Sequence, residues 1–172
     1  MVAALVLASV VNVADKPPQH RHVRSTDGRI RVLIEKGVAR STTFRHLMDV
    51  LDTSDVIVYF DPKLSRPLLH GYLNHHMTVA GGIRYIRVMA DVTGAETRGI
   101  AIIAHELQHA VEVANAPEVR DDRSLALLFE RAHLQFGCAG ECFETQAAID
   151  VEYTVIAELK ATKGPSTLAS GR

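Results

Sequence analysis

The chain has 172 residues, of which 47% are hydrophobic and 23% are charged, and this balance suits one globular domain with a sizeable core. Its formal net charge of -1 at pH 7 provides no general attraction to nucleic acid or to an anionic membrane, so partners must be inferred from local sites. Nine histidines stand out in a chain that has no tryptophan, and an excess of histidine is a first indication of metal binding.

The first fourteen residues, MVAALVLASVVNVA, form an apolar run with small residues near its end, and the polar segment DKPPQHRH follows. This order resembles the apolar region of a secretory signal peptide and the start of a mature protein. The run is too short to cross a bilayer as a helix, which needs about 20 residues. We interpret residues 1–20 as a signal peptide and linker of a secreted or periplasmic protein. If residues 1–14 are instead a core strand or helix, the expected location is the cytoplasm.

Two short helices are predicted after the basic segment QHRHVRSTDG, whose composition is typical of disorder. Apolar residues recur at helical spacing from Ile30 to Val38, and this first helix is expected to stop near Gly37. Ser41 is typical of the N-cap of a second helix. The apolar residues of that helix are Phe44, Leu47, Met48 and Leu51.

Strands are predicted in the middle of the chain. The run SDVIVYFDP is rich in β-branched and aromatic residues and ends at a proline, which is typical of a short strand. Two further strands, Leu68 to Val79 and Ile83 to Ala90, flank Gly81 and Gly82 and are expected to pair through a glycine turn.

Three helices are predicted from Gly94 onward, over residues 96–114, 122–135 and 141–162, because apolar residues repeat there at helical spacing. The only two cysteines, Cys138 and Cys142, lie between the last two of these helices or at their edges. They are too few for a four-ligand zinc site. They would pair in an oxidising compartment and remain free thiols in the cytosol, so they leave the compartment open.

The segment IIAHELQHAV places His105, Glu106 and His109 in a helix that is otherwise apolar. Polar groups cost a few kcal/mol to bury without a partner, so their position calls for a compensating interaction. Residues four apart share one helix face, so both imidazoles can direct a nitrogen at one zinc ion. Glu106 would then lie beside a zinc-activated water as its general base. An ordinary buried or exposed histidine pair is the alternative interpretation.

This HExxH helix resembles the active-site helix of the zincin metallopeptidases, and the order of elements over residues 56–112 is similar to their upper subdomain. The resemblance implies a peptide-bond hydrolase with one zinc ion, ligands His105 and His109, and Glu106 as base. Glu112 stands where the metzincin extension HExxHxxGxxH has its glycine. A gluzincin-like site, with a downstream glutamate as third ligand, is therefore favoured.

Glu130 and Glu144 compete as the third ligand. Glu130 lies 21 residues after His109, a spacing that resembles thermolysin-like enzymes, but it is expected at the flank of its helix. Glu144 is expected on a helix face shared with Ala147, Ala148, Val151 and Val155, which points it toward the interior. A carboxylate placed there needs a partner, so Glu144 is preferred. Thr145 or Asp150 is expected to support the site from behind the ligands.

Further residues have both functional and ordinary interpretations. Tyr153 and His133 could donate a hydrogen bond to a transition-state oxyanion, although each is more often structural. His75 and His76 are expected to be an ordinary pair and not a second metal site. Strand Ile83 to Val88 is expected to bind a peptide substrate along the edge of the sheet.

The sequence thus predicts an α+β, zincin-like fold, in which residues 21–172 form one domain with a small β-sheet, the HExxH helix and downstream helices. The predicted partner is a peptide or protein substrate, without nucleic acid or stable membrane insertion, and the oligomeric state is open. One alternative is a regulatory protein whose residues 28–52 form a helix-turn-helix-like DNA-binding segment. Another is a zincin-like binding module without catalytic turnover.

Overall fold

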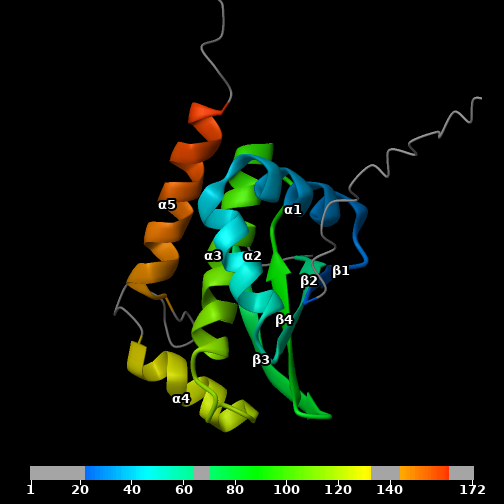
Figure 1. Cartoon of the computed structure of the whole chain (residues 1–172), viewed down its shortest axis with the longest axis vertical. Helices are drawn as coiled ribbons and strands as arrows, with labels where there is room; N and C mark the ends of the chain where they lie inside the picture. The colour runs from blue at the N-terminus through cyan, green and yellow to red at the C-terminus, as the bar shows by residue number, and fades with distance from the viewer. Residues whose placement is uncertain (1–21, 64–69, 133–143, 163–172) are drawn as a thin grey trace, which may run out of the picture.

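The computed structural model describes residues 22–63, 70–132 and 144–162 (Figure 1). These residues form a mixed α+β arrangement, as predicted. The elements in chain order are β1 (Val23–Ser25), α1 (Gly28–Arg40), α2 (Thr42–Asp52), β2 (Val56–Pro62), β3 (Gly71–Ala80), β4 (Ile83–Ala90), α3 (Glu96–Ala114), α4 (Asp122–Ala132) and α5 (Gln146–Ala161).

The four described strands form one sheet in the order β1-β2-β4-β3. β1, β2 and β4 are parallel, and β3 is the antiparallel edge strand beside β4. Gly81 and Gly82 make the β3–β4 turn with φ angles of 58° and 81°, a left-handed backbone that glycine adopts without steric cost. The predicted hairpin is confirmed. The prediction that β4 is an edge strand is wrong, because β2 and β3 occupy both of its sides.

Part of the segment that was expected to be disordered is a strand. Val23 to Ser25 pair in parallel with Val58 to Phe60, and Val23 is buried. Three residues carry too little periodicity to be recognised in a sequence window, and the neighbouring strand β2 supplies their hydrogen bonds.

Helices α1 and α2 are separated by a single extended residue, Ser41, whose hydroxyl accepts a hydrogen bond from Phe44 N at 2.9 Å. The predicted N-cap is confirmed. α1 does not stop at Gly37 and continues to Arg40. Packing requires a glycine at position 37, because a Cβ there would lie 2.7 Å from the ring of Phe44. The glycine therefore permits close approach of α2 and does not terminate α1.

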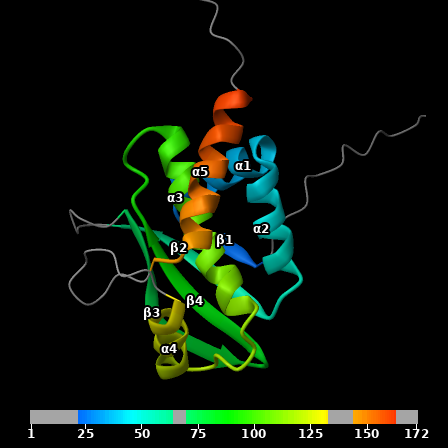
Figure 2. The same cartoon turned by 90° about the vertical axis from the view of Figure 1, so that its left-hand side faces the viewer.

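The HExxH helix, α3, is the centre of the fold. It lies between the sheet and α5, with α1 and α2 beside it (Figure 1). Its burial on nearly all sides explains why most of its residues outside the HExxH motif are apolar. α4 contacts β3 at one end of the molecule (Figure 2).

The start of the last helix differs from the sequence prediction, and the predicted end of the preceding helix, at residue 135, lies outside the described residues. α5 begins at Gln146 and not near Glu141, because Thr145 is its N-cap. α4 begins at Asp122 as predicted and extends to Ala132 within the described residues. The predictions for residues 1–14, His133, Cys138 and Cys142 lie outside the described residues. Within the described ranges, no helix is both long and apolar enough to cross a membrane.

Candidate metal centre

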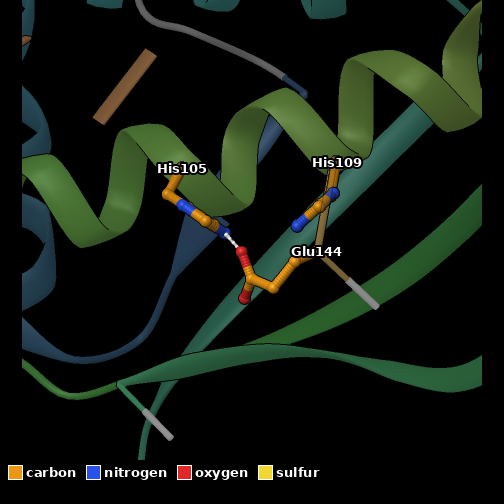
Figure 3. A group of neighbouring side chains, drawn as sticks. All are labelled: His105, His109 and Glu144. Atoms are coloured by element: carbon orange, nitrogen blue, oxygen red, sulfur yellow. Dashed lines mark ion pairs between the residues drawn. The ribbon is translucent and has the colours of Figure 1, made fainter. Parts of the chain in front are cut away.

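His105, His109 and Glu144 form a group that could hold a metal ion. One ligand atom from each residue lies within 4.8 Å of the other two (Figure 3). The two imidazoles come from successive turns of α3 and are 8% and 4% exposed. Glu144 comes from the segment before α5 and reaches the imidazoles from the other side of the group. The structure therefore brings together the three residues that the sequence analysis selected as metal ligands.

Each histidine is oriented by a carboxylate at its Nδ1 atom. Glu152 Oε2, on α5, lies 3.2 Å from His105 Nδ1, and Glu112 Oε2, on α3, lies 2.9 Å from His109 Nδ1. A carboxylate can only accept, so Nδ1 donates in both pairs when the carboxylate is ionised. When the ring is neutral, this leaves the lone pair on Nε2, as metal binding requires, and when the His105 ring is protonated its Nε2 atom donates to Glu144 Oε2 instead.

The third member of the group, Glu144, lies in a different kind of segment from the one that the sequence analysis expected. The sequence analysis placed it on the inner face of a helix, whereas it lies two residues before the first residue of α5. The helical-face argument for this residue was therefore wrong, although the residue does join the group. Its competitor, Glu130, is exposed on α4 and is not a member of the group.

The donor set suits zinc. Two imidazole nitrogens and one carboxylate oxygen are its usual catalytic ligands, at bond lengths of about 2.0–2.2 Å in a tetrahedron. That geometry separates neighbouring donors by roughly 3.3 Å. His105 Nε2 and Glu144 Oε2 are 3.2 Å apart. Three protein ligands also leave a fourth position for water or substrate.

The electrostatics of the group favour a cation. Burial by itself lowers the pKa of His105, but the hydrogen bonds that its ring donates to Glu144 and Glu152 outweigh burial and raise this pKa to about 10. The same carboxylates that attract a proton to the imidazole would attract a metal ion. Burial opposes ionisation of Glu144, yet the hydrogen bond from His105 lowers the pKa of Glu144 below its ordinary value. The ligand carboxylate is therefore held in its anionic form.

Glu106 is buried beside these residues with an unsatisfied oxygen. It is 3% exposed, and its Oε2 atom has no hydrogen-bond partner among the described residues. Burial raises the pKa of Glu106 to about 6, because the charged form is poorly solvated there. Leaving a buried acceptor without a partner costs about 1–3 kcal/mol. A buried oxygen of this kind indicates a missing partner, and a water molecule or a substrate proton would supply it.

Gly71, the first residue of β3, fixes the place of Glu106. A Cβ at Gly71 would lie 2.3 Å from Glu106 Oε1 and 2.9 Å from its Cδ. The Glu106 carboxylate therefore lies against the backbone of the edge strand, where only a residue without a side chain leaves room for it.

Sequence analysis did not find three residues that shape the site: Glu112, Glu152 and Gly71. Glu112 could have been found, because it lies three residues after His109 and therefore on the same helix face. Glu152 and Gly71 had no such local signal, because they come from elements that meet α3 only in the folded chain.

Among the other candidate residues that the structure describes, only Thr145 contacts the residues of the site. Tyr153 is 69% exposed on α5, and Asp150 accepts a hydrogen bond from Gln146 Nε2 at 2.7 Å. His75 and His76 lie on β3, where His76 Nδ1 is 2.8 Å from Asp122 Oδ2. Thr145 does contact the site, as a donor to Glu112 Oε1 at 2.7 Å.

Comparison of the chain with protein-family models, with curated proteins and with solved structures finds no match. The functional argument therefore depends on the residues and the geometry described above.

On the hypothesis from the sequence that Glu106 is the general base of a zinc hydrolase, Gly71→Ala is expected to lower hydrolytic activity by roughly 100-fold without loss of zinc, because misplacing a catalytic group by about 1 Å can cost that much. The new Cβ would displace the Glu106 carboxylate and leave the three ligands in place. Steady-state kinetics and metal analysis of the same sample would measure both effects. Gly94→Ala is the matched control, since a Cβ there meets only Arg98 Cδ, at 3.9 Å. Equal activity of the two variants would contradict the placement of Glu106.

Proposed function

We propose that this protein is a zincin-like, gluzincin-type metallopeptidase that hydrolyses peptide bonds with one zinc ion per chain. His105, His109 and Glu144 are the proposed ligands, and Glu106 is the proposed general base. The observation that carries the proposal is the buried Glu106 Oε2 atom, which has no hydrogen-bond partner in the described part of the chain and lies next to a three-donor group of zinc-type ligands. A histidine pair with only a structural role would not account for a buried carboxylate kept beside it.

The chemistry follows from these positions. A bound zinc ion would act as a Lewis acid and lower the pKa of a water ligand to near 7. Glu106 takes the proton of the attacking water and later passes it to the leaving amine. Its buried setting, which raises the pKa of Glu106 to about 6, suits a group that must both accept and release a proton near neutral pH. Glu112 and Glu152 keep the two imidazoles in position during this exchange.

We infer that the substrate pairs with β3 and not with β4. β3 is an edge strand, and its first residue, Gly71, lies against Glu106. An extended peptide that adds to this edge would bring a scissile bond past the proposed base. Farther along β3, Asp122 Oδ1 accepts a hydrogen bond from Met77 N at 2.8 Å. The start of β3 is therefore the proposed segment for pairing with substrate.

The DNA-binding alternative is less well supported. In a helix-turn-helix, the N-terminal residues of the second helix contact base edges. In this chain the N-terminus of α2 is occupied by the Glu158 carboxylate of α5, which accepts hydrogen bonds from Ser41 Oγ, Thr43 N and Thr43 Oγ1. A carboxylate at that position also repels phosphate.

The alternative of an inactive zincin-like binding module is distinguished from the proposal by an assay of peptide cleavage. It predicts that the protein binds zinc and cleaves no peptide.

Zinc content and ligand substitutions test the proposal. Purified protein reconstituted with zinc is expected to hold about one ion per chain, and to cleave unfolded protein substrates in a manner that a chelator abolishes. Protein that stays metal-free after reconstitution would contradict the proposal. Zinc binding without cleavage would support the inactive module instead.

Glu144→Ala is expected to weaken zinc binding by tenfold or more, because it removes one of three protein ligands. Glu130→Ala is the matched control, since Glu130 is an exposed glutamate on a neighbouring helix. Chelator competition would measure both affinities. If Glu130→Ala weakened binding more than Glu144→Ala, the third ligand would be Glu130.

A further inference from the structure

The proposed third ligand, Glu144, lies outside regular secondary structure. It precedes Thr145, the N-cap of α5, whose backbone carbonyl accepts the first helical hydrogen bond of α5, from Ile149 N at 3.2 Å. The Glu144 carboxylate contacts His105, but that contact involves the ligand atoms themselves. Accurate placement of the carboxylate therefore has to come from its chain neighbours.

Thr145 is the neighbour that is firmly held. It is 6% exposed, and its hydroxyl takes part in two hydrogen bonds. As N-cap of α5 the hydroxyl accepts from Ala148 N at 3.2 Å, and with its one hydrogen it donates to Glu112 Oε1 at 2.7 Å. Thr145 thus ties the first turn of α5 to α3.

Glu112 continues this connection to the site. Its Oε2 atom accepts a hydrogen bond from His109 Nδ1 at 2.9 Å, while its Oε1 atom accepts from Thr145. Glu112 is half-buried, and both bonds involve an ionised carboxylate, which makes them stronger than bonds between neutral groups. The bonds among Ala148 N, Thr145, Glu112 and His109 form one continuous chain between two helices.

We propose that Glu112 and Thr145 are positioning residues that hold Glu144 in register with His109. The inference rests on the proposed zinc site. Thr145 is joined to Glu144 by a peptide bond, so a shift of Thr145 relative to α3 shifts the Glu144 carboxylate relative to both imidazoles. Glu112 has a double function in this link, because it fixes the His109 tautomer and receives Thr145. Losing either residue would disturb two ligands at once.

Substitutions at Thr145 test one end of the link. Thr145→Val keeps the shape of the side chain and removes both hydrogen bonds, and it is expected to weaken zinc binding about tenfold. Thr145→Ser retains the hydroxyl and is expected to restore affinity to within about twofold of the parent. The matched control is Thr154→Val on the same helix, because the Thr154 hydroxyl donates only to Asp150 O. Affinity would be measured by chelator competition on the full chain.

The variant Glu112→Gln tests the Glu112 end of the link and is expected to lose 10- to 100-fold in zinc affinity. Its control is Glu118→Gln, which makes the same chemical change at an exposed position.

The double variant Glu112→Gln/Thr145→Val distinguishes the link from a simple loss of the helix cap. If the residues act through one chain of bonds, the double variant loses less than the product of the two single losses. The visible spectrum of the cobalt-substituted protein is also expected to change in both single variants and in neither control.

Three results would count against the inference. If both single variants bind zinc as tightly as their controls, the link has no positioning role, although the zinc site stands. If the loss of zinc affinity in the double variant equals the product of the two single losses, Thr145 acts only as a helix cap. If the parent protein binds neither zinc nor cobalt, the proposed function fails first and the inference fails with it.

Discussion

Under the proposed mechanism, Glu106→Gln is expected to lower peptide hydrolysis by at least 100-fold, and by as much as about 10,000-fold, without weakening zinc binding. The amide has nearly the same shape as the carboxylate, but it cannot accept a proton from water. Because Glu106 is 3% exposed and its Oε2 atom has no partner among the described residues, the exchange should not cost much stability. Rate constants, metal content and urea unfolding of one preparation would separate the three effects.

Glu130→Gln is the control for this substitution, since it makes the same chemical change at an exposed glutamate on α4. Activity in the Glu106→Gln variant equal to that of the parent would exclude Glu106 as the base. Loss of zinc together with activity would instead mean that Glu106 helps to hold the metal. These results are distinguishable because metal content is measured on the same sample.

Arg84→Met is expected to lower the free energy of unfolding by roughly 3 kcal/mol, because it removes the hydrogen bonds of a fully buried guanidinium and hydrogen bonds to charged groups contribute about 1.5–3 kcal/mol each. Arg84, on β4, is fully buried. Its Nε and Nη2 atoms donate to the two oxygens of Asp55 at 3.0 and 2.5 Å. Its Nη1 atom donates to the carbonyl oxygens of Val113, Ala116 and Val119 at 2.8, 2.8 and 3.1 Å.

The Arg84 side chain therefore attaches the C-terminal end of the HExxH helix to the sheet. Methionine would fill the space but remove the guanidinium donor from those carbonyl groups, of which Val113 O and Ala116 O keep a backbone donor. A loss of this size is a large fraction of the 5–15 kcal/mol that stabilises a typical domain, so the variant should unfold at much lower urea concentration. Arg87→Met is the matched control, on the same strand, because the Arg87 side chain is 57% exposed. Similar unfolding curves for the two variants would contradict the structural importance of Arg84.

The stabilisation by this pair has a defined pH dependence. Hydrogen bonds from Arg84 are the main reason that the pKa of Asp55 lies below its ordinary value of 3.8. The contribution of Asp55 is therefore complete above that value and is lost as the pH falls through the lowered pKa. In the Arg84→Met variant, unfolding is expected to depend less on pH in this acidic range.

The local sequence determined much of the fold and the centre of the site. Helical periodicity identified α2 and α3, a serine N-cap marked the start of α2, and a glycine pair between two apolar segments identified the β3–β4 hairpin, because these signals depend on residues close in the chain. The HExxH spacing placed His105 and His109 one turn apart, and helical geometry alone is sufficient for that.

Tertiary structure decided what depends on contacts between distant segments. β4 is an inner strand only because β1 and β2 join on its other side, and no window of the sequence carries strand order. Glu144 reaches the imidazoles from outside a helix, because α5 packs along α3 and begins only after its N-cap, Thr145. The contact between Gly71 and Glu106 also depends on tertiary structure. These residues are 35 positions apart in the sequence, and only the packing of β3 against α3 brings them together. The sequence by itself thus determined which residues could bind a metal on one helix, and the fold determined which others could join them.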